Sequence, residues 1–250
     1  MSHEDAIVRP VSTGRSPRLG PRAVLAASDA DVQSLRKAMV LPDSCPLYMS
    51  RLYYNAANPV WPVVAGPIMG APYAAMLLEI LRAWGVRKAL FLGWCGSIDP
   101  GIRIGDIIIP SGAYIDEGTS VHYNQCGQEV VRPDATLEHL LGERLSRQRT
   151  HFHSGSIWTT DAIFRETPTQ VRKYQRLGAV AVEMELSALL AVAAFYTLPM
   201  AAVLTVSDEL STFKWRTGFK ADGFKQSRLT ACRLITDLFG PENDTIHDEY

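Results

Sequence analysis

The sequence has few cysteines, and none is placed to form a disulfide framework or a zinc site. The four that occur are Cys45, Cys95, Cys126 and Cys232, widely spaced and without a Cys-x-x-Cys pair. This pattern is typical of reduced thiols in a cytoplasmic protein. Long apolar runs are also absent, and residues 1–5 have no signal-peptide pattern. We therefore expect a cytoplasmic protein without a membrane span.

An excess of one charge is missing as well. The chain has 25 Lys and Arg against 26 Asp and Glu, and both signs are spread along its length. Such a balance provides no electrostatic surface for nucleic acid or for an anionic membrane, so neither is expected as a partner. Apolar residues, in contrast, make up 47% of the 250 residues. That content is sufficient for one large domain with a hydrophobic core.

The chain divides into a polar N-terminal arm and one folded domain. Residues 1–22 are interrupted by proline and glycine, which predicts an extended arm, whereas residues 23–250 are expected to form a single domain. Strands are predicted at residues 23–27, 61–65, 88–93, 106–110, 155–159, 179–183 and 200–206. Helices are predicted at residues 71–84, 133–147, 168–177, 185–196 and 219–238. This alternation indicates an α/β fold with a largely parallel, buried sheet covered by helices.

Acidic residues follow two of the predicted strands. The motif Val182-Glu183-Met184-Glu185 ends one strand, and Ser207-Asp208 ends another. Burying an unpaired carboxylate costs several kcal/mol, so acids in such places are expected to be hydrogen-bonded or used. The carboxyl ends of adjacent strands in an α/β sheet form the ligand crevice. Two acids there point to hydroxyl binding and proton transfer.

A glycine-rich segment at residues 93–96 follows another strand. A dinucleotide-binding fingerprint would open a helix, which Asp99-Pro100-Gly101 prevents. A nucleophile elbow built on Cys95 would need glycine where Ser97 stands. The remaining interpretations are a tight turn whose backbone N–H groups line a ligand crevice, or a plain turn that holds a buried Cys95. The residue types alone leave both open.

Other polar and aromatic residues give weaker signals. His151 and His153 share a face of a predicted strand, but without a third ligand they do not indicate a metal site. Thr167 is expected to cap a helix that starts at Pro168. Four aromatic residues fit either the core or a stacking platform for a planar base, and these are Trp158, Phe164, Phe213 and Trp215.

The ordered motifs carry a family resemblance. They are Gly93-x-Cys95-Gly96, Ile104-Gly-Asp-Ile-Ile-Ile-Pro110, Asp116-Glu-Gly-Thr-Ser-x-His-Tyr123, Thr159-Thr-Asp161, Val182-Glu-Met-Glu185 and Val206-Ser-Asp208. Together they resemble the nucleoside phosphorylase superfamily, in the branch that contains uridine phosphorylase, hexameric purine nucleoside phosphorylase and the methylthioadenosine nucleosidases. The resemblance covers roughly residues 23–238. It implies a three-layer α/β/α fold with a twisted mixed central sheet, a homo-oligomer (dimer, trimer or hexamer) and no cofactor or metal.

The resemblance also implies cleavage of a ribosyl N-glycosidic bond and gives roles to residues at the two acidic motifs. Glu185 matches the acid that holds the ribose hydroxyls, and Met184 matches the methionine under the sugar. Asp208 matches the acid that serves the leaving base. The expected base contacts are Glu183, Phe164 and Ser207. These roles agree with an oxocarbenium-like transition state, which needs an oriented sugar and an acid for the leaving group.

The residues that bind phosphate in this family are not recognisable. Its Gly-Asp-Pro-x-Arg loop is replaced by residues 27–32, and the expected arginine and small hydroxyl residue at the Gly-x-x-Gly segment are replaced by Phe91 and Trp94. Losing cations removes charge-assisted hydrogen bonds. We still expect Gly93, Trp94, Cys95 and Gly96 to line the nucleophile or anion turn, with Arg51 as a surviving family arginine. Other cations that could reach the crevice are Arg15, Arg18, Arg22 and Arg103.

Three functions therefore remain open. The first is a nucleoside phosphorylase with phosphate as acceptor, and the second is a hydrolase in which water attacks the sugar. The hydrolase branch typically has a glutamate near the first strand, and Asp29 or Asp31 lies close to that place. The third is a protein that binds a nucleoside without turnover. Asp208 favours a purine, whereas Phe164 and Arg165 leave a pyrimidine open.

Overall fold

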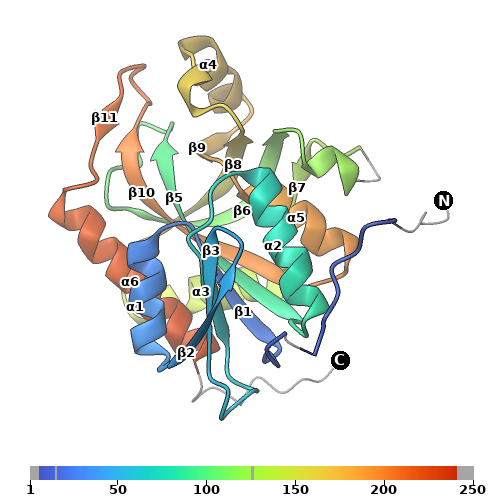
Figure 1. Ribbon diagram of the computed structural model, residues 1–250. Helices are drawn as coiled ribbons and strands as arrows, with labels where there is room; N and C mark the ends of the chain where they lie inside the picture. The colour runs from blue at the N-terminus through green and yellow to red at the C-terminus, as the bar shows by residue number, and fades with distance from the viewer. Residues whose placement is uncertain (1–5, 15, 125–126, 241–250) are drawn as a thin grey trace.

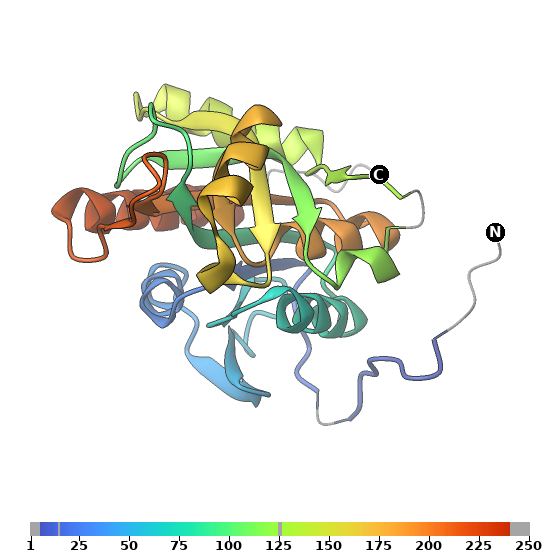
Figure 2. The same cartoon turned by 90° about the horizontal axis from the view of Figure 1, so that it is seen from above.

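The computed structural model describes residues 6–14, 16–124 and 127–240, so Arg15, Cys126 and the end of the predicted domain lie outside the described residues. A mixed sheet occupies the middle of the molecule, and helices cover both of its faces (Figure 1). The view from above shows the same arrangement (Figure 2). The predicted three-layer α/β/α fold is therefore confirmed.

The described residues form one sheet of 11 strands. The strands are β1 (Arg22–Ala26), β2 (Asp43–Leu47), β3 (Ser50–Tyr54), β4 (Val63–Gly66), β5 (Lys88–Ser97), β6 (Ile107–Asp116), β7 (Val130–Val131), β8 (His153–Thr160), β9 (Ala179–Glu183), β10 (Met200–Glu209) and β11 (Arg216–Thr217). Their order is β11-β10-β6-β8-β9-β5-β1-β4-β3-β2, and β7 pairs with β6. In addition β5 pairs directly with β10, so part of the sheet closes on itself.

Helices pack on the two faces of the sheet. They are α1 (Asp29–Ala38), α2 (Ala71–Ala83), α3 (Ala135–Arg147), α4 (Pro168–Arg176), α5 (Leu186–Phe195) and α6 (Asp222–Phe239), with short 3₁₀ turns at Ser120–His122 and Ile163–Arg165. As predicted, Thr167 caps α4 and accepts a hydrogen bond from the backbone N–H of Gln170. None of the helices in the described part of the chain is long and apolar enough to cross a membrane.

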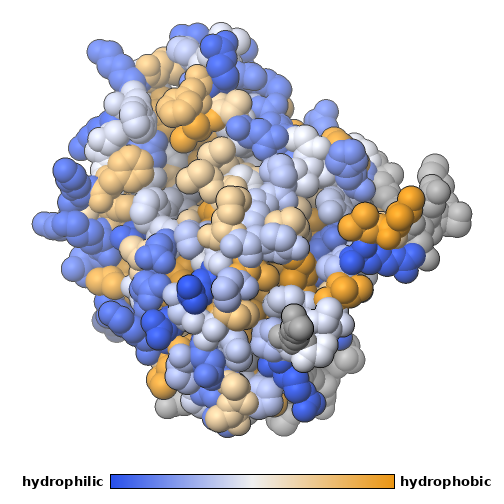
Figure 3. Space-filling view, viewed as in Figure 1, coloured by the Kyte–Doolittle hydropathy of each residue, from blue (hydrophilic) through white to orange (hydrophobic). Residues whose placement is uncertain are grey.

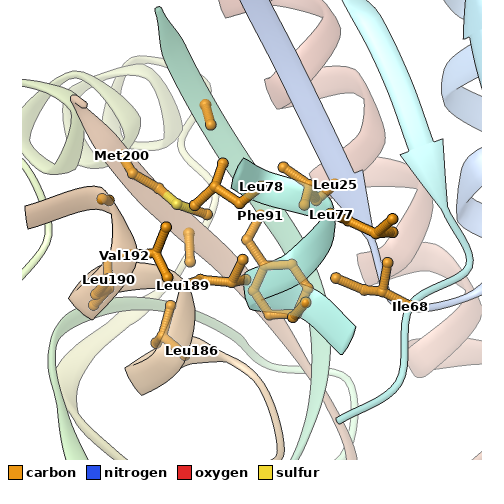
Figure 4. Packing of buried hydrophobic residues seen from close by; sticks show 14 of the residues in the cluster. Leu25, Ile68, Leu77, Leu78, Phe91, Leu186, Leu189, Leu190, Val192 and Met200 are labelled. Carbon is orange, nitrogen blue, oxygen red and sulfur yellow. The ribbon is translucent and has the colours of Figure 1, made fainter. Parts of the chain in front are cut away.

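Alternate residues of the central strands build two separate hydrophobic cores. Leu25 of β1 and Phe91 of β5 face α2 and α5, where they pack with Leu78 and Leu189 (Figure 4). Val24 faces the other side, in the core that includes residues of α1, α3 and α6. This alternation follows from the two-residue period of a strand. Because both faces are covered, the strands are apolar along most of their length, which explains why they were predictable.

Four parts of the fold were not predicted, and one of them is the two-residue strand β7. The hairpin of β2 and β3 lies at the edge of the sheet and contains Pro46, a residue that a strand pattern normally excludes. Helix α1 is polar on its exposed side, and its start depends on Ser28, whose hydroxyl accepts a hydrogen bond from the N–H of Asp31. Strand β11 has two residues, both exposed; it pairs with β10, and Arg216 also donates to the carboxylate of Glu209.

The described part of the N-terminal arm contains no helix or strand before β1. The indole of Trp84, at the end of α2, donates a hydrogen bond to the carbonyl oxygen of Val11 and so ties the arm to the domain. The side chains of Ile7, Val8 and Val11 are exposed. Figure 3 shows hydrophobic surface beside the grey N-terminal atoms, on a face that otherwise mixes hydrophobic and hydrophilic residues.

Candidate active site

The site is organised around the end of strand β5. There Gly96 pairs with Val182 of β9 on one side and with Asp208 of β10 on the other. A Cβ atom at residue 96 would collide with Leu210 and would lie 3.0 Å from Oδ2 of Asp208. Glycine therefore permits the close approach of β10. The strand pairing brings the two acidic motifs, which are far apart in the sequence, to the same edge of the sheet.

The carboxylate of Glu183 caps helix α5. It accepts hydrogen bonds from the hydroxyl of Thr159 at 2.6 Å and from the backbone N–H groups of Glu185 at 2.7 Å and Leu186 at 2.8 Å. Burial and the neighbouring Glu185 raise the pKa of Glu183, while these three donors oppose the rise. Its contact with a base stays a prediction. The structure shows that both of its oxygens already have donors within the protein.

Glu185 can accept more hydrogen bonds from a ligand than Glu183 can. Its side chain is 6% exposed, and Oε1 accepts a hydrogen bond from the N–H of Gly70 at 2.5 Å. Among the described residues the donors to this carboxylate are backbone N–H groups, those of Gly70 and Met184, and a carboxylate with two oxygens can accept further hydrogen bonds. Burial raises the pKa of Glu185, and the backbone donors Gly70 and Met184 oppose the rise. Met184 is half-buried beside it. A hydroxyl-rich ligand could donate to the acceptor positions that remain.

Asp208 is half-buried and has a donor at each oxygen. The hydroxyl of Ser207 lies 2.6 Å from Oδ1, and the indole Nε1 of Trp215 lies 2.8 Å from Oδ2. The same hydroxyl lies 3.2 Å from the carbonyl oxygen of Cys95. Because a serine hydroxyl has one proton, it can donate to an ionised Asp208, or donate to Cys95 and accept from a protonated Asp208. The hydroxyl of Ser207 therefore has a hydrogen-bond partner whether Asp208 is ionised or protonated.

A third acid, which sequence reasoning missed, lies near Asp208. Burial raises the pKa of Glu166 to about 7, and the charge of Asp208 adds to the rise. Glu166 follows the 3₁₀ turn that contains Phe164, whose ring is 92% exposed. No sequence motif marks Glu166, because its loop meets Asp208 only in the folded chain. The role of Phe164 as a base contact stays a prediction.

The raised pKa of Glu166 makes stability depend on pH. The folded state holds this proton up to about pH 7, whereas the unfolded chain releases it near the ordinary value of 4.5. The contribution of Glu166 to stability is therefore full below pH 4.5 and is lost as the pH rises towards 7. We expect the Glu166→Gln variant to lose less stability than the wild type between pH 5 and 7.5. Thermal melts at pH 5 and pH 7.5 measure the difference, and Glu143→Gln is the surface control. An equal change of melting temperature with pH in all three proteins would contradict this prediction.

The predicted turn at residues 93–96 is wrong, because these residues belong to strand β5. Trp94 pairs with Thr205 and Cys95 pairs with Val206, so the ladder with β10 extends the strand beyond Gly93. One of the two interpretations expected a buried Cys95. Cys95 is buried, and burial raises the pKa of its thiol. It is not an activated nucleophile. A role of this segment in anion binding remains a prediction.

Trp94 joins a buried charged network at the start of α1. Its indole Nε1 donates to Oδ2 of Asp31 at 2.7 Å, and the hydroxyl of Ser28 donates to the same oxygen at 2.7 Å. The guanidinium of Arg228, on α6, donates to Oδ1 of Asp31 through two nitrogens at 2.9 and 2.7 Å. Asp31 is 1% exposed. All four hydrogen bonds thus converge on a carboxylate that belongs to the protein itself.

Two of the cations predicted for the crevice, Arg51 and Arg103, make contacts within the chain. Arg51 is exposed on β3 and donates to the hydroxyl of Ser44. Arg103 forms an ion pair with Glu209 at 3.7 Å. Neither contact links these arginines to residues 93–96, and their predicted role is untested. Among the described residues no group of three His, Cys, Asp or Glu side chains could hold a metal ion.

Most of the chain matches a known family model. The model described as Phosphorylase superfamily matches residues 15–239. The chain belongs to this superfamily. DeoD-type purine nucleoside phosphorylase from Caldanaerobacter subterraneus subsp. tengcongensis is 32% identical over 153 residues, which are 60% of this chain and 65% of that protein. The corresponding enzyme of Bacillus cytotoxicus is 31% identical over 152 residues. The match thus spans slightly less than two thirds of these relatives.

Solved structures of a phosphorylase and of a nucleosidase share the fold. Uridine phosphorylase from Vibrio fischeri ES114 aligns with a TM-score of 0.75 and 16% identity, covering 91% of this chain and 99% of that one. A 5'-methylthioadenosine/S-adenosylhomocysteine nucleosidase from Helicobacter pylori aligns with a TM-score of 0.70 and 17% identity, covering 88% and 97%. Phosphorylases and nucleosidases therefore both occur among proteins with this architecture.

Proposed function

We propose that this superfamily member cleaves the N-glycosidic bond of a nucleoside, preferably a purine nucleoside, and that water is the acceptor. The observation that carries the proposal is the pairing of Gly96 with both β9 and β10, which brings Glu185 and Asp208 to one edge of the sheet. Glu185 offers a carboxylate oxygen to the ribose hydroxyls. Asp208, with Ser207 beside it, serves the leaving base.

The reaction divides between these two acids. Glu185 orients the sugar, with Met184 against it, which lowers the entropic part of the barrier. The glycosidic C–N bond breaks with its electron pair going to the base, and the proton held by Asp208 passes to a base nitrogen. The oxygen of water bonds to the anomeric carbon and its proton passes to solvent. Asp208 regains a proton from solvent, and the products are the free base and free ribose.

The network of Asp31 supports water rather than phosphate as acceptor. The resemblance implies a phosphate-binding loop directly after the first strand, and here α1 follows β1 with Asp31 in its first turn. An arginine, an indole N–H and a hydroxyl are donors that would suit an oxyanion, but they are all taken by this buried carboxylate. A phosphate would have to approach that negative charge.

Phosphate remains the second candidate acceptor, because the relatives with 31 and 32% identity are purine nucleoside phosphorylases. Product analysis separates the two. The protein is incubated with inosine, adenosine and uridine, with and without inorganic phosphate, and the sugar product is identified. We expect free ribose at a rate independent of phosphate. Ribose 1-phosphate, formed only when phosphate is present, would assign the phosphorylase reaction instead. Binding of a nucleoside without any base release would favour the non-catalytic alternative.

Replacing Glu185 by Gln tests the sugar site. Hydrogen bonds to a charged acceptor contribute more than neutral ones, so we expect kcat/KM for a ribonucleoside to fall about tenfold to a hundredfold. The matched substrate control is the 2′-deoxynucleoside, which lacks one partner hydroxyl and should lose less. Steady-state kinetics on both substrates measures the ratio. An equal loss on both substrates would show that Glu185 does not contact the 2′-hydroxyl.

A further inference from the structure

Trp215 holds the acid of the proposed site by a hydrogen bond that the proposed reaction does not use. Its indole Nε1 donates to Oδ2 of Asp208 at 2.8 Å, although 64% of the residue is exposed. The next two residues form β11, which pairs Thr217 with Asp208 itself. The N–H of Gly218 also donates to the carbonyl oxygen of Ser207 at 2.8 Å. The backbone on the C-terminal side of the indole is therefore fixed to β10.

The other side of this loop is also anchored. Phe213 has a positive φ of 61° and its ring lies 4.4 Å from the guanidinium carbon of Arg172 on α4. The N–H of Phe213 donates to the carbonyl oxygen of Leu210. Residues on both sides of Trp215 are thus held, while the indole itself extends into solvent. Its exposure means that the side chain can turn away from Asp208 without leaving a buried cavity behind.

The two oxygens of Asp208 are not equivalent for a ligand. Oδ1 is held by Ser207, its neighbour on the same strand, within the buried end of β10. Among the described residues Trp215 is the hydrogen-bond donor to Oδ2, which lies over Gly96 at the end of β5. A base nitrogen that approaches from this edge meets Oδ2. The indole N–H and a base nitrogen consequently compete for one oxygen atom.

We infer that Trp215 is a gate for the leaving base: its indole occupies Oδ2 of Asp208 in the free protein and is displaced when a purine base binds. The inference rests on the proposed function for the identity of the ligand. Displacement of the indole N–H frees Oδ2 for the nitrogen of the base. Trp215 acts through Asp208 and is therefore a positioning residue. It also selects ligands, because a ligand must displace the indole to reach Oδ2.

Tryptophan fluorescence detects the displacement directly. The probes are free adenine, hypoxanthine and uracil, and the proteins are the wild type, Trp215→Phe and, as matched control, Trp84→Phe. Trp84 lies at the end of α2 and its indole bonds to the N-terminal arm. We expect the purine bases to change the emission of the wild type and of Trp84→Phe, and to change that of Trp215→Phe far less. An unaltered response in Trp215→Phe would overturn the gate.

Calorimetry gives a second readout that a merely structural role would not produce. Phenylalanine keeps a ring but has no N–H to compete for Oδ2, so adenine should bind Trp215→Phe about two- to tenfold more tightly than the wild type. For a nucleoside that the protein cleaves, kcat/KM should rise through a lower KM. Weaker or unchanged adenine binding by Trp215→Phe would contradict the gate.

The two proposals fail separately. If adenine displaces the indole but no nucleoside is cleaved, the gate holds and the proposed function is wrong. If nucleosides are cleaved and the indole does not respond to any base, the proposed function holds and the gate is wrong. Absence of both base binding and cleavage would overturn both.

Discussion

The Asp208→Asn variant is expected to lose about 10²- to 10⁴-fold in kcat on a purine nucleoside, the usual contribution of a general acid. The loss arises because an amide cannot deliver a proton to the leaving base. The substitution should leave the surroundings intact. The amide oxygen can accept from Trp215, and the amide nitrogen can donate to the Ser207 hydroxyl, which then donates to the carbonyl oxygen of Cys95.

A change of leaving group provides the control for this variant. The control substrate is 4-nitrophenyl riboside, from which 4-nitrophenolate departs without being protonated. Cleavage of this substrate should therefore be affected much less by Asp208→Asn than cleavage of inosine. Circular dichroism and thermal melting confirm that the fold is kept. Equal losses on both substrates would show that Asp208 does not act as an acid. Unchanged turnover of inosine would remove Asp208 from the mechanism altogether.

The Asp31→Asn variant is expected to lose about 3–5 kcal/mol of stability, because it leaves the charge of Arg228 without its buried partner. Asn also presents an N–H group either to Arg228 or to Trp94, which are both donors. For a chain of this size the melting temperature should fall by roughly 6–20 °C. Denaturant unfolding and thermal melting measure the loss.

Two further variants make this prediction specific. The double variant Asp31→Asn with Arg228→Met removes the stranded charge and should recover most of the lost stability. Arg233→Met, at an exposed position on the same helix, should have little effect.

Inorganic phosphate should raise the melting temperature of Asp31→Asn more than that of the wild type, since the freed donors can bind an anion. A stable single variant without a phosphate response would contradict the account of this network.

Residues that end a buried strand were predictable from the sequence. Apolar runs of limited length mark strands, and the acids that follow them, Glu183 and Asp208, were predicted to lie at the carboxyl edge of the sheet. The pairing of Gly96 with Val182 and with Asp208 brings both motifs to the end of β5, although β9 is antiparallel to β5 and Asp208 lies within β10 instead of after it. Recognising their order along the chain also gave the correct superfamily. Their individual roles are not decided by these positions.

Contacts between distant segments were not predictable. Asp31 and Arg228 are 197 residues apart, and neither lies in a motif that indicates a partner. Glu166 meets Asp208 only through the loop before α4. The predicted turn at residues 93–96 was wrong for the same reason: glycine and cysteine suggested a turn locally, whereas pairing with β10 continues the strand. Tertiary pairing thus overrides local preference at the site.

The central claim is that Glu185 and Asp208 form a site that cleaves nucleosides, and base release tests it most directly. Wild type, Glu185→Gln and Asp208→Asn are each incubated with inosine, adenosine, guanosine and uridine, and the released base is quantified by chromatography. We predict multiple turnovers of at least one purine nucleoside by the wild type and a large loss in both variants. Release of no base from any of the four, or equal release by all three proteins, would contradict it.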